Sequence, residues 1–419
     1  MTEHASDRGP TRVIVLRAVA LAVLLLALRI PLWQHPTPVQ SPDEENFMLA
    51  LGFPADYPVH HPGYPLWVAL GTLLHATGIG AYASYQVWSL AASIAAPVLL
   101  YAGLRRLLND GLAWWLAMAF GVNPLLWFQA TTALTYPTAA VFGLIVIGLC
   151  LRALQNRQAR SASCAAIVLA IGVFLRADLL VFLGPMVVFT ACRCGRRAVW
   201  TTVLPLIAGV AGYMAVTTYL YGRAESAAPR PDLSHTVDVI LGTSVLKLGL
   251  VDGLLRNLVK IVLNLSWDLG VAVLLLPVAV VGVARGRTPW VGTVLLLWVV
   301  PSLTFLLLLH EVQGYFMLLL PAAYCVIGLA LQNKYRPATA MRVAAAIAIC
   351  SAAQFSLWPW SAEGTGLKRL LDAKIAFQSA SGLRQIDQRP TIHEPGDFWH
   401  TAAHEATSTQ PAGAHDNDE

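Results

Sequence analysis

The sequence predicts an all-α polytopic membrane protein, and two observations carry this prediction: the composition and the spacing of the apolar segments. Of the 419 residues, 57% are hydrophobic and only 12% are charged, whereas soluble globular domains carry about 25% charged residues. Apolar windows of about 20 residues, the length that crosses a bilayer core, recur along the chain. Because these windows are continuously apolar and do not alternate, they predict helices and not the strands of a β-barrel.

The apolar windows predict about eleven membrane spans, several of them short for a bilayer core. The spans cover residues 13–33, 84–104, 112–128, 131–151, 162–176, 178–192, 198–221, 268–284, 289–309, 314–332 and 340–358. Lysine and arginine collect in alternate links between these spans, and the loop 34–83 contains neither. The positive-inside rule then predicts a cytoplasmic N-terminus, an extracytoplasmic loop 34–83 and an extracytoplasmic C-terminus. Few external cysteines and no organellar signal favour the bacterial plasma (inner) membrane.

The spans divide the chain into a transmembrane domain over residues 1–358 and a polar extracytoplasmic tail over 359–419, which is expected to be partly disordered. Residues 64–78 in the first loop are apolar but too short to cross a bilayer. They predict a helix in the membrane interface, with Tyr64 and Trp67 at headgroup depth. A second extracytoplasmic stretch, 222–267, begins polar and becomes amphipathic.

An acidic stretch directly after the first span is the strongest candidate for a functional site. Asp43, Glu44 and Glu45 follow one another in SPDEEN, and ionisable groups near membrane depth are functional candidates by default. Three adjacent acids raise one another's pKa, which suits a base that works near neutral pH. The alternative is a helix start, with Ser41 as the cap and Pro42 in the first position. The two interpretations are compatible, because a capped turn also fixes a carboxylate in place.

The first loop also contains His60 and His61, which precede a Pro-Gly-Tyr-Pro run. The residue before a proline favours extended backbone, so one histidine is expected to face the acids and the other to face outward. A histidine together with Asp43 and Glu44 could bind a divalent metal. No HExxH or paired-cysteine spacing favours it, so the sequence requires no cofactor and leaves a metal open.

Two further groups of polar residues lie at the edges of predicted spans. Arg176 and Asp178 stand two residues apart in an apolar segment, where they either neutralise each other or leave the arginine fork to bind phosphate. The second group lies at a predicted extracytoplasmic turn. It is either a polar turn or a second wall of the same cavity, and it consists of His310, Glu311, Gln313 and Tyr315.

These residues resemble a known family. An acidic pair after the first span, Asp43-Glu44, followed by His61-Pro62-Gly63-Tyr64-Pro65-Leu66, resembles the GT-C membrane glycosyltransferases, above all the protein O-mannosyltransferase-like group and the lipid A aminoarabinose transferases. Arg176 before a helix and Tyr315 before LLLP are weaker similarities. The resemblance implies a GT-C-like bundle, a sugar donor carried on a polyprenyl phosphate, and transfer on the extracytoplasmic face to a lipid, glycan or protein of the cell envelope.

The chemistry of such a transfer assigns expected roles. An acceptor hydroxyl needs a base, and we expect Asp43 to serve, with Glu44 as its partner or as a binder of the acceptor. A leaving phosphate needs positive charge and not a proton, which Arg176 would supply. A single displacement would invert the anomeric centre. The remaining predicted substrate-binding residues are His60, His61, Tyr64, His310, Gln313 and Tyr315.

Other classes of function fit the composition less well. A transporter or a flippase for lipid-linked sugars also carries sparse intramembrane charge. Transporters, however, are typically built from inverted repeats with broken helices, and the sequence shows no internal repeat. A non-catalytic scaffold would tolerate the loss of Asp43. The net charge of +5 comes without a basic arm, so nucleic acid is not an expected partner.

Overall fold

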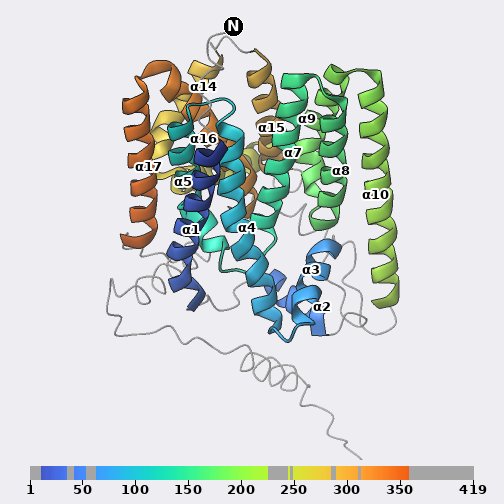
Figure 1. Cartoon of the computed structure of the whole chain (residues 1–419). Coiled ribbons are helices and arrows are strands. Elements are labelled where there is room, and N and C mark those ends of the chain that lie inside the picture. Colours follow the sequence, from blue (N-terminus) through green and yellow to red (C-terminus); the bar gives the residue numbers. More distant parts are fainter. Residues whose placement is uncertain are drawn as a thin grey trace, which may run out of the picture.

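The protein is a bundle of helices that run between two opposite ends (Figure 1). The computed structural model describes residues 11–34, 42–52, 63–224, 244–245, 249–284, 289–309 and 313–357. The predicted tail 359–419 lies outside these described residues. The first half of the bundle contains α1 (Thr11–Gln34), α2 (Pro42–Gly52), α3 (Pro65–His75), α4 (Ala81–Leu104), α5 (Asp110–Gly121), α6 (Pro124–Gln129), α7 (Tyr136–Asn156), α8 (Ala159–Leu175) and α9 (Asp178–Cys194). The second half contains α10 (Arg196–Ala224), α13 (Leu250–Leu269), η1 (Gly270–Leu275), α14 (Leu276–Ala284), α15 (Pro289–Leu308), η2 (Gln313–Tyr315), α16 (Phe316–Lys334) and α17 (Pro337–Leu357).

The all-α membrane class predicted from the sequence is confirmed. In the part of the chain that the structure describes, eight segments are long and apolar enough to cross a membrane: α1, α4, α7, α10, the run Leu250–Gly282, α15, α16 and α17. Helices α8 and α9 have 17 residues each, and at 1.5 Å per residue each reaches about 25 Å. That length is near the lower limit for a span, as the short predicted spans there anticipated.

The predicted span 112–128 is instead two helices, α5 and α6, which meet at Asn123. The side-chain Oδ1 of Asn123 accepts hydrogen bonds from the backbone N–H groups of Leu125 at 3.0 Å and Leu126 at 3.5 Å. Pro124 follows in the first position of α6, where its missing N–H does no harm. An Asn cap followed by proline therefore ends one helix and begins the next inside a continuously apolar sequence.

The segment from Leu250 to Gly282 also differs from the sequence prediction. Its first part was expected to lie outside the membrane as an amphipathic stretch, but α13, η1 and α14 together form one apolar run long enough to cross. Gly270 interrupts the run because its φ of 51° is left-handed, a conformation that glycine adopts at little cost. Asn257 of α13 donates from its Nδ2 to the carbonyl of Leu307 at 2.8 Å, which joins α13 to α15.

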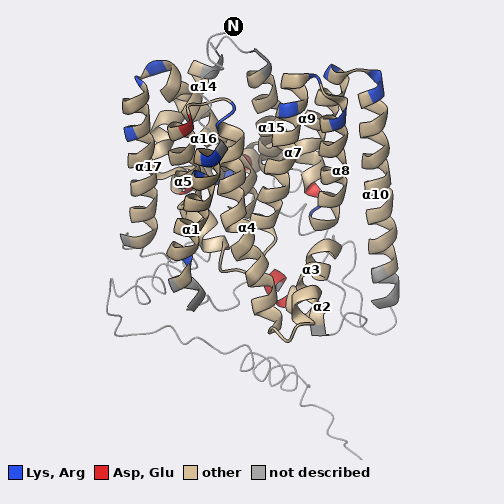
Figure 2. Cartoon of the chain, viewed as in Figure 1, with Lys and Arg blue, Asp and Glu red and all other residues tan. Residues whose placement is uncertain are grey.

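Charge separates the two ends of the bundle (Figure 2). Lysine and arginine gather at the helix ends that lie opposite α2 and α3, and we call this the basic end. The opposite end, which we call the site end, carries the acids of α2. Following the chain, the site end also receives the α6–α7 link, the α8–α9 link and η2. The basic end receives the α4–α5, α7–α8, α9–α10 and α16–α17 links, with Arg105, Arg106, Arg157, Arg196, Arg197, Lys334 and Arg336.

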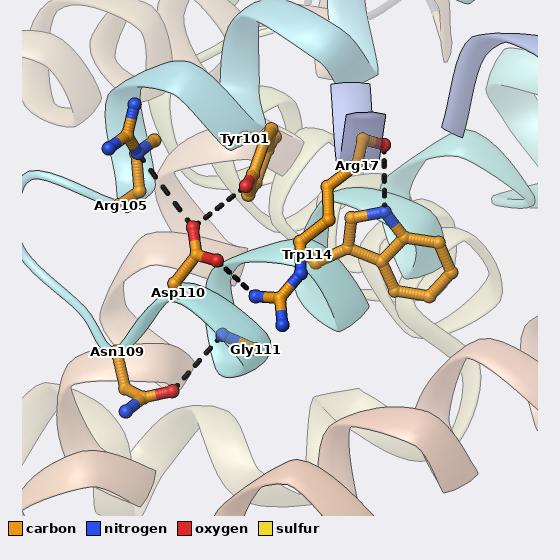
Figure 3. A network of polar contacts seen from close by, with 7 residues as sticks. All are labelled: Arg17, Tyr101, Arg105, Asn109, Asp110, Gly111 and Trp114. Carbon is orange, nitrogen blue, oxygen red and sulfur yellow. Dashed lines mark hydrogen bonds and ion pairs between the residues drawn. The ribbon is translucent and has the colours of Figure 1, made fainter. Parts of the chain in front are cut away.

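A polar network at the basic end fixes three helices to one another (Figure 3). The carboxylate of Asp110, at the start of α5, pairs with Arg17 of α1 and accepts a hydrogen bond from the Tyr101 hydroxyl of α4 at 2.7 Å. Arg105 Nε lies 3.8 Å from the same carboxylate. Trp114 donates its indole N–H to the backbone carbonyl of Arg17 at 3.1 Å. One aspartate thus joins α1, α4 and α5 far from the acids of the site end.

Candidate active site

Helix α2 presents the acidic stretch at its N-terminus. It begins at Pro42 and has Asp43, Glu44 and Glu45 in its first turn, as the capping interpretation predicted. Negative charge there is stabilised by the helix dipole. Glu44 is buried, and the Tyr82 hydroxyl of α4 donates to its Oε2 at 3.1 Å, whereas Asp43 is half-buried. The structure therefore gives the two neighbouring acids different surroundings.

The buried α6–α7 link accepts hydrogen bonds from side chains of α3 and α4. Trp67 of α3 donates its indole N–H to the carbonyl of Ala133 at 3.1 Å, and Gln86 of α4 donates to the carbonyl of Thr131 at 2.6 Å. The Trp67 ring stacks on Tyr85, with centroids 5.2 Å apart. Trp67 was expected at headgroup depth. Its side chain is fully buried inside the protein, where its ring packs against aromatic neighbours and its N–H is satisfied by a backbone carbonyl.

Tyr64 has an unusual backbone conformation. Its φ of 45° and ψ of 46° are left-handed, and it stands between Gly63, with φ 111°, and Pro65. A non-glycine residue there costs roughly 1–3 kcal/mol, and such strain collects at functional sites. The ring of Phe47 meets the Tyr64 ring edge-on with centroids 5.3 Å apart. Burial raises the pKa of Tyr64 well above its usual value, against the opposing effect of Arg176, so the phenol stays protonated.

Arg176 and Asp178 form a buried ion pair in the α8–α9 link. Arg176 Nε lies 3.2 Å from both carboxylate oxygens of Asp178, and Nη2 lies 2.6 Å from Oδ2. Arg176 Nη1 donates to the hydroxyl of Thr135 at 2.9 Å. The side chains are 5% and 13% exposed, so solvent screens the pair little. The sequence left two interpretations of these charges open. The structure contains the first of them, an ion pair in which Arg176 and Asp178 neutralise each other.

Three tyrosines from separate segments surround this arginine. The Cζ of Arg176 lies 4.5 Å from the ring centroid of Tyr136, 4.8 Å from that of Tyr315 and 5.8 Å from that of Tyr64. These distances are within the range of cation–π attraction. Burial raises the pKa of Tyr315 as well. We call the following residues the Arg176 cluster: Tyr64, Thr135, Tyr136, Arg176, Asp178 and Tyr315.

Asp43 lies beside the Arg176 cluster. It shares a face of α2 with Phe47, four residues on, and Phe47 contacts Tyr64 of the cluster. The Asp43 carboxylate is also close enough to the Tyr136 phenol to interact with it electrostatically. The structure thus brings together four residues that the sequence singled out: Asp43, Tyr64, Arg176 and Tyr315.

Sequence reasoning missed two residues of the Arg176 cluster, Thr135 and Tyr136. Tyr136 is the more informative of the two. It is the first residue of α7, followed by Pro137, whereas the sequence predicted a span that already began at residue 131. The only available signal was the Tyr-Pro pair, since proline favours the first position of a helix. Recognising that signal would have placed Tyr136 at the site end and not inside the membrane.

Several predicted site residues lie where the structure gives no detail. His60, His61 and His310 fall outside the described residues, and Gln313 begins η2 without a described side chain. Among the described residues no group of three or more His, Cys, Asp or Glu side chains is arranged to hold a metal ion. The histidines that a metal site with Asp43 would need, His60 and His61, are not among these residues.

Comparison with known proteins gives a likeness in structure and none in sequence. No protein-family model matches the chain, and no curated protein matches it at a significant level. ArnT from Cupriavidus metallidurans bound to undecaprenyl phosphate superposes with a TM-score of 0.54 at 14% identity, over 88% of this chain and 70% of ArnT. Its apo state gives 0.52 at 13% identity over the same shares.

The second similar protein is longer, and this chain covers a smaller share of it. The Archaeoglobus fulgidus oligosaccharyltransferase, in complex with Zn and sulfate, superposes with a TM-score of 0.51 at 14% identity, over 95% of this chain and 56% of that protein. At these identities the likeness concerns the fold. The chain has the fold of the GT-C membrane glycosyltransferases, as the sequence resemblance implied.

Proposed function

We propose that the protein transfers a sugar from a polyprenyl-phosphate donor to an acceptor hydroxyl on the extracytoplasmic face of a bacterial plasma membrane. One observation carries the proposal. At the site end, the Asp43 carboxylate interacts electrostatically with Tyr136, whose ring contacts Arg176, and Arg176 is paired with Asp178. The basic end would face the cytoplasm by the positive-inside rule, which puts the site end outside. The undecaprenyl phosphate bound to ArnT supports a donor of this class.

Asp43 would act as the general base. The acceptor oxygen bonds to the anomeric carbon while its proton passes to the Asp43 carboxylate. The bond between the anomeric carbon and the phosphate oxygen breaks, and its electron pair leaves with the phosphate. A single displacement of this kind inverts the anomeric centre. Glu44, held by Tyr82 at 3.1 Å, would fix the first turn of α2 and with it the position of Asp43.

The Arg176 cluster would bind the leaving phosphate and stabilise its negative charge. The phenols of Tyr64 and Tyr315 stay protonated, so they offer neutral donors that need not lose a proton. Asp178 holds the Arg176 guanidinium through Nε and Nη2, which keeps the cation in place before the donor arrives. Preorganised donors of this kind stabilise charge that develops at the leaving group. We assign His60, His61, His310 and Gln313 to substrate binding.

The test supplies membranes containing the protein with polyprenyl phosphates that carry labelled mannose, glucose, arabinose or galacturonic acid. Asp43→Asn should abolish transfer at an unchanged protein level, because the amide cannot accept the proton. Asp110→Asn is the matched control, since it makes the same change at the basic end, and it should retain transfer. Full transfer by the Asp43→Asn variant would exclude Asp43 as the base. Movement of the donor across the membrane without transfer would favour a flippase.

A further inference from the structure

The N-terminus of α7 has a threonine in the capping position that does not cap the helix. Thr135 is the N-cap residue, and threonine there usually accepts a hydrogen bond from a backbone N–H of the first turn. The Thr135 side chain makes no such bond. Its Oγ1 accepts instead from Nη1 of Arg176 at 2.9 Å. A hydroxyl that accepts from a cation keeps its own proton to donate.

The first backbone N–H groups of α7 have no hydrogen-bond acceptor among the described residues. The first backbone hydrogen bond at this end joins the Ala139 N–H to the Thr135 carbonyl at 2.9 Å. The N–H groups of Tyr136 and Thr138 precede it, and Pro137 between them has none. Unsatisfied N–H groups at a helix N-terminus point outward along the axis and attract negative charge.

The hydroxyl of Thr138 is a further donor without a partner in the part of the chain that the structure describes. The residue is only 8% exposed, and its Oγ1 makes no hydrogen bond there. Thr135 and Thr138 stand three residues apart, so they share a face of α7. Side chains of a helix lean toward its N-terminus, which directs the Thr138 hydroxyl toward the contact between Thr135 and Arg176.

Two contacts show that this face of α7 meets the last turn of α8. Thr135 bonds to Arg176, and the Phe142 ring lies where a Cβ on Gly172 would be 3.3 Å away. Arg176 and Gly172 are one turn apart, joined by the bond from the Arg176 N–H to the Gly172 carbonyl at 2.8 Å. Thr138 lies between Thr135 and Phe142 on α7, so it faces the turn of α8 that ends at Arg176.

We propose that the N-terminus of α7 binds the phosphate of the lipid-linked donor, through the hydroxyls of Thr135 and Thr138, the N–H groups of Tyr136 and Thr138, and the Arg176 guanidinium. The inference rests on the proposed function and names further residues that bind its phosphate. All these groups donate hydrogen bonds, and phosphate oxygens accept them. The aromatic rings that enclose Arg176 must move aside for the phosphate to enter. The phosphate gains one negative charge when the bond to the sugar breaks, so these donors stabilise the leaving group more than the intact donor.

The experiment measures binding of undecaprenyl phosphate to the purified protein in detergent by isothermal titration calorimetry, with inorganic phosphate as a second arm. Thr138→Val keeps the shape of the side chain and removes a hydroxyl without a partner, so the free energy of unfolding should not fall. Affinity for undecaprenyl phosphate should fall roughly tenfold, the effect of losing one hydrogen bond to a charged group. Thr138→Ser keeps the hydroxyl and should restore most of the affinity.

Thr202→Val is the matched control, because Thr202 carries another buried hydroxyl without a partner among the described residues and lies near the start of α10, toward the basic end. It should leave the affinity unchanged. Unchanged affinity in Thr138→Val, or an equal loss in Thr202→Val, would overturn the inference. A loss confined to inorganic phosphate would also overturn it, since the donor phosphate would then bind elsewhere. Binding needs no transfer, so a parent protein that binds undecaprenyl phosphate through Thr138 but transfers no sugar would refute the proposed function alone.

Discussion

Replacing Asp178 with Asn removes the carboxylate that holds Arg176, and the structure allows the cost to be worked out. Asp178 accepts from Nε at 3.2 Å and from Nη2 at 2.6 Å, and both side chains are nearly inaccessible, at 5% and 13% exposed. Removing one partner of a buried ion pair costs about 3–5 kcal/mol, because the other charge stays buried without compensation. Asn keeps the shape and one acceptor oxygen, so we expect the lower end, about 3 kcal/mol.

A double-mutant cycle separates the pair from the rest of the site. Arg176→Gln leaves Asp178 buried, but an aspartate can escape this state by taking up a proton, whereas an arginine cannot lose one. Arg176→Gln should therefore destabilise the protein less through the broken pair than Asp178→Asn does. The double variant has no uncompensated charge, so its cost should fall short of the sum of the single costs by roughly 2 kcal/mol.

The assay is reversible unfolding in mixed detergent–SDS micelles, with the free energy of unfolding compared across the four proteins. Asp110→Asn again serves as the control, because its carboxylate is 27% exposed and its pairs are better screened. A change below about 0.5 kcal/mol for Asp178→Asn, the range of ordinary surface substitutions, would refute the view that the pair holds the α8–α9 link. Additive single costs would show that Arg176 and Asp178 are not coupled.

Three further substitutions test the supports of the site and of the bundle. Trp67→Ala should cost about 3–5 kcal/mol in the free energy of unfolding, because a fully buried indole and its bond to Ala133 are lost; an interfacial anchor would cost far less. Asn123→Ala should cost about 2 kcal/mol in the same assay, through loss of the α6 cap and of the hydrogen bond that Nδ2 donates to the Asp268 carbonyl. Asn123→Asp should not restore this stability, because a buried carboxylate cannot donate to that carbonyl. Asp110→Asn should lower the free energy of unfolding slightly, by about 1 kcal/mol or less, and high salt should reduce the difference.

Hydropathy and charge predicted the bundle well because they act locally. A segment of about 20 apolar residues enters a bilayer almost regardless of its neighbours, and this is why nearly all the predicted spans recur as helices. The departures occur where a backbone signal overrides hydropathy. Asn123 followed by Pro124 divides an apolar segment into α5 and α6, and Gly270 ends α13 within the apolar run Leu250–Gly282.

The candidate site was predictable only in part. Asp43 lies in an acidic stretch directly after an apolar segment and Arg176 lies inside one, and both features can be read from the linear sequence. Trp67 and Tyr136 carry no such mark, because an aromatic residue beside a membrane span is common at the lipid interface. Only their contacts, with Ala133 for Trp67 and with Arg176 for Tyr136, show that they pack inside the protein.

The sequence by itself determined that the chain is a helical membrane protein with its acids and its basic links on opposite ends, because transfer free energy and the positive-inside bias depend on local composition. The tertiary structure decided that Arg176 is paired with Asp178 and enclosed by Tyr64, Tyr136 and Tyr315. These tyrosines come from three segments far apart in the chain, and only the packing of the start of α3, of α7 and of η2 against the α8–α9 link brings them to one cation.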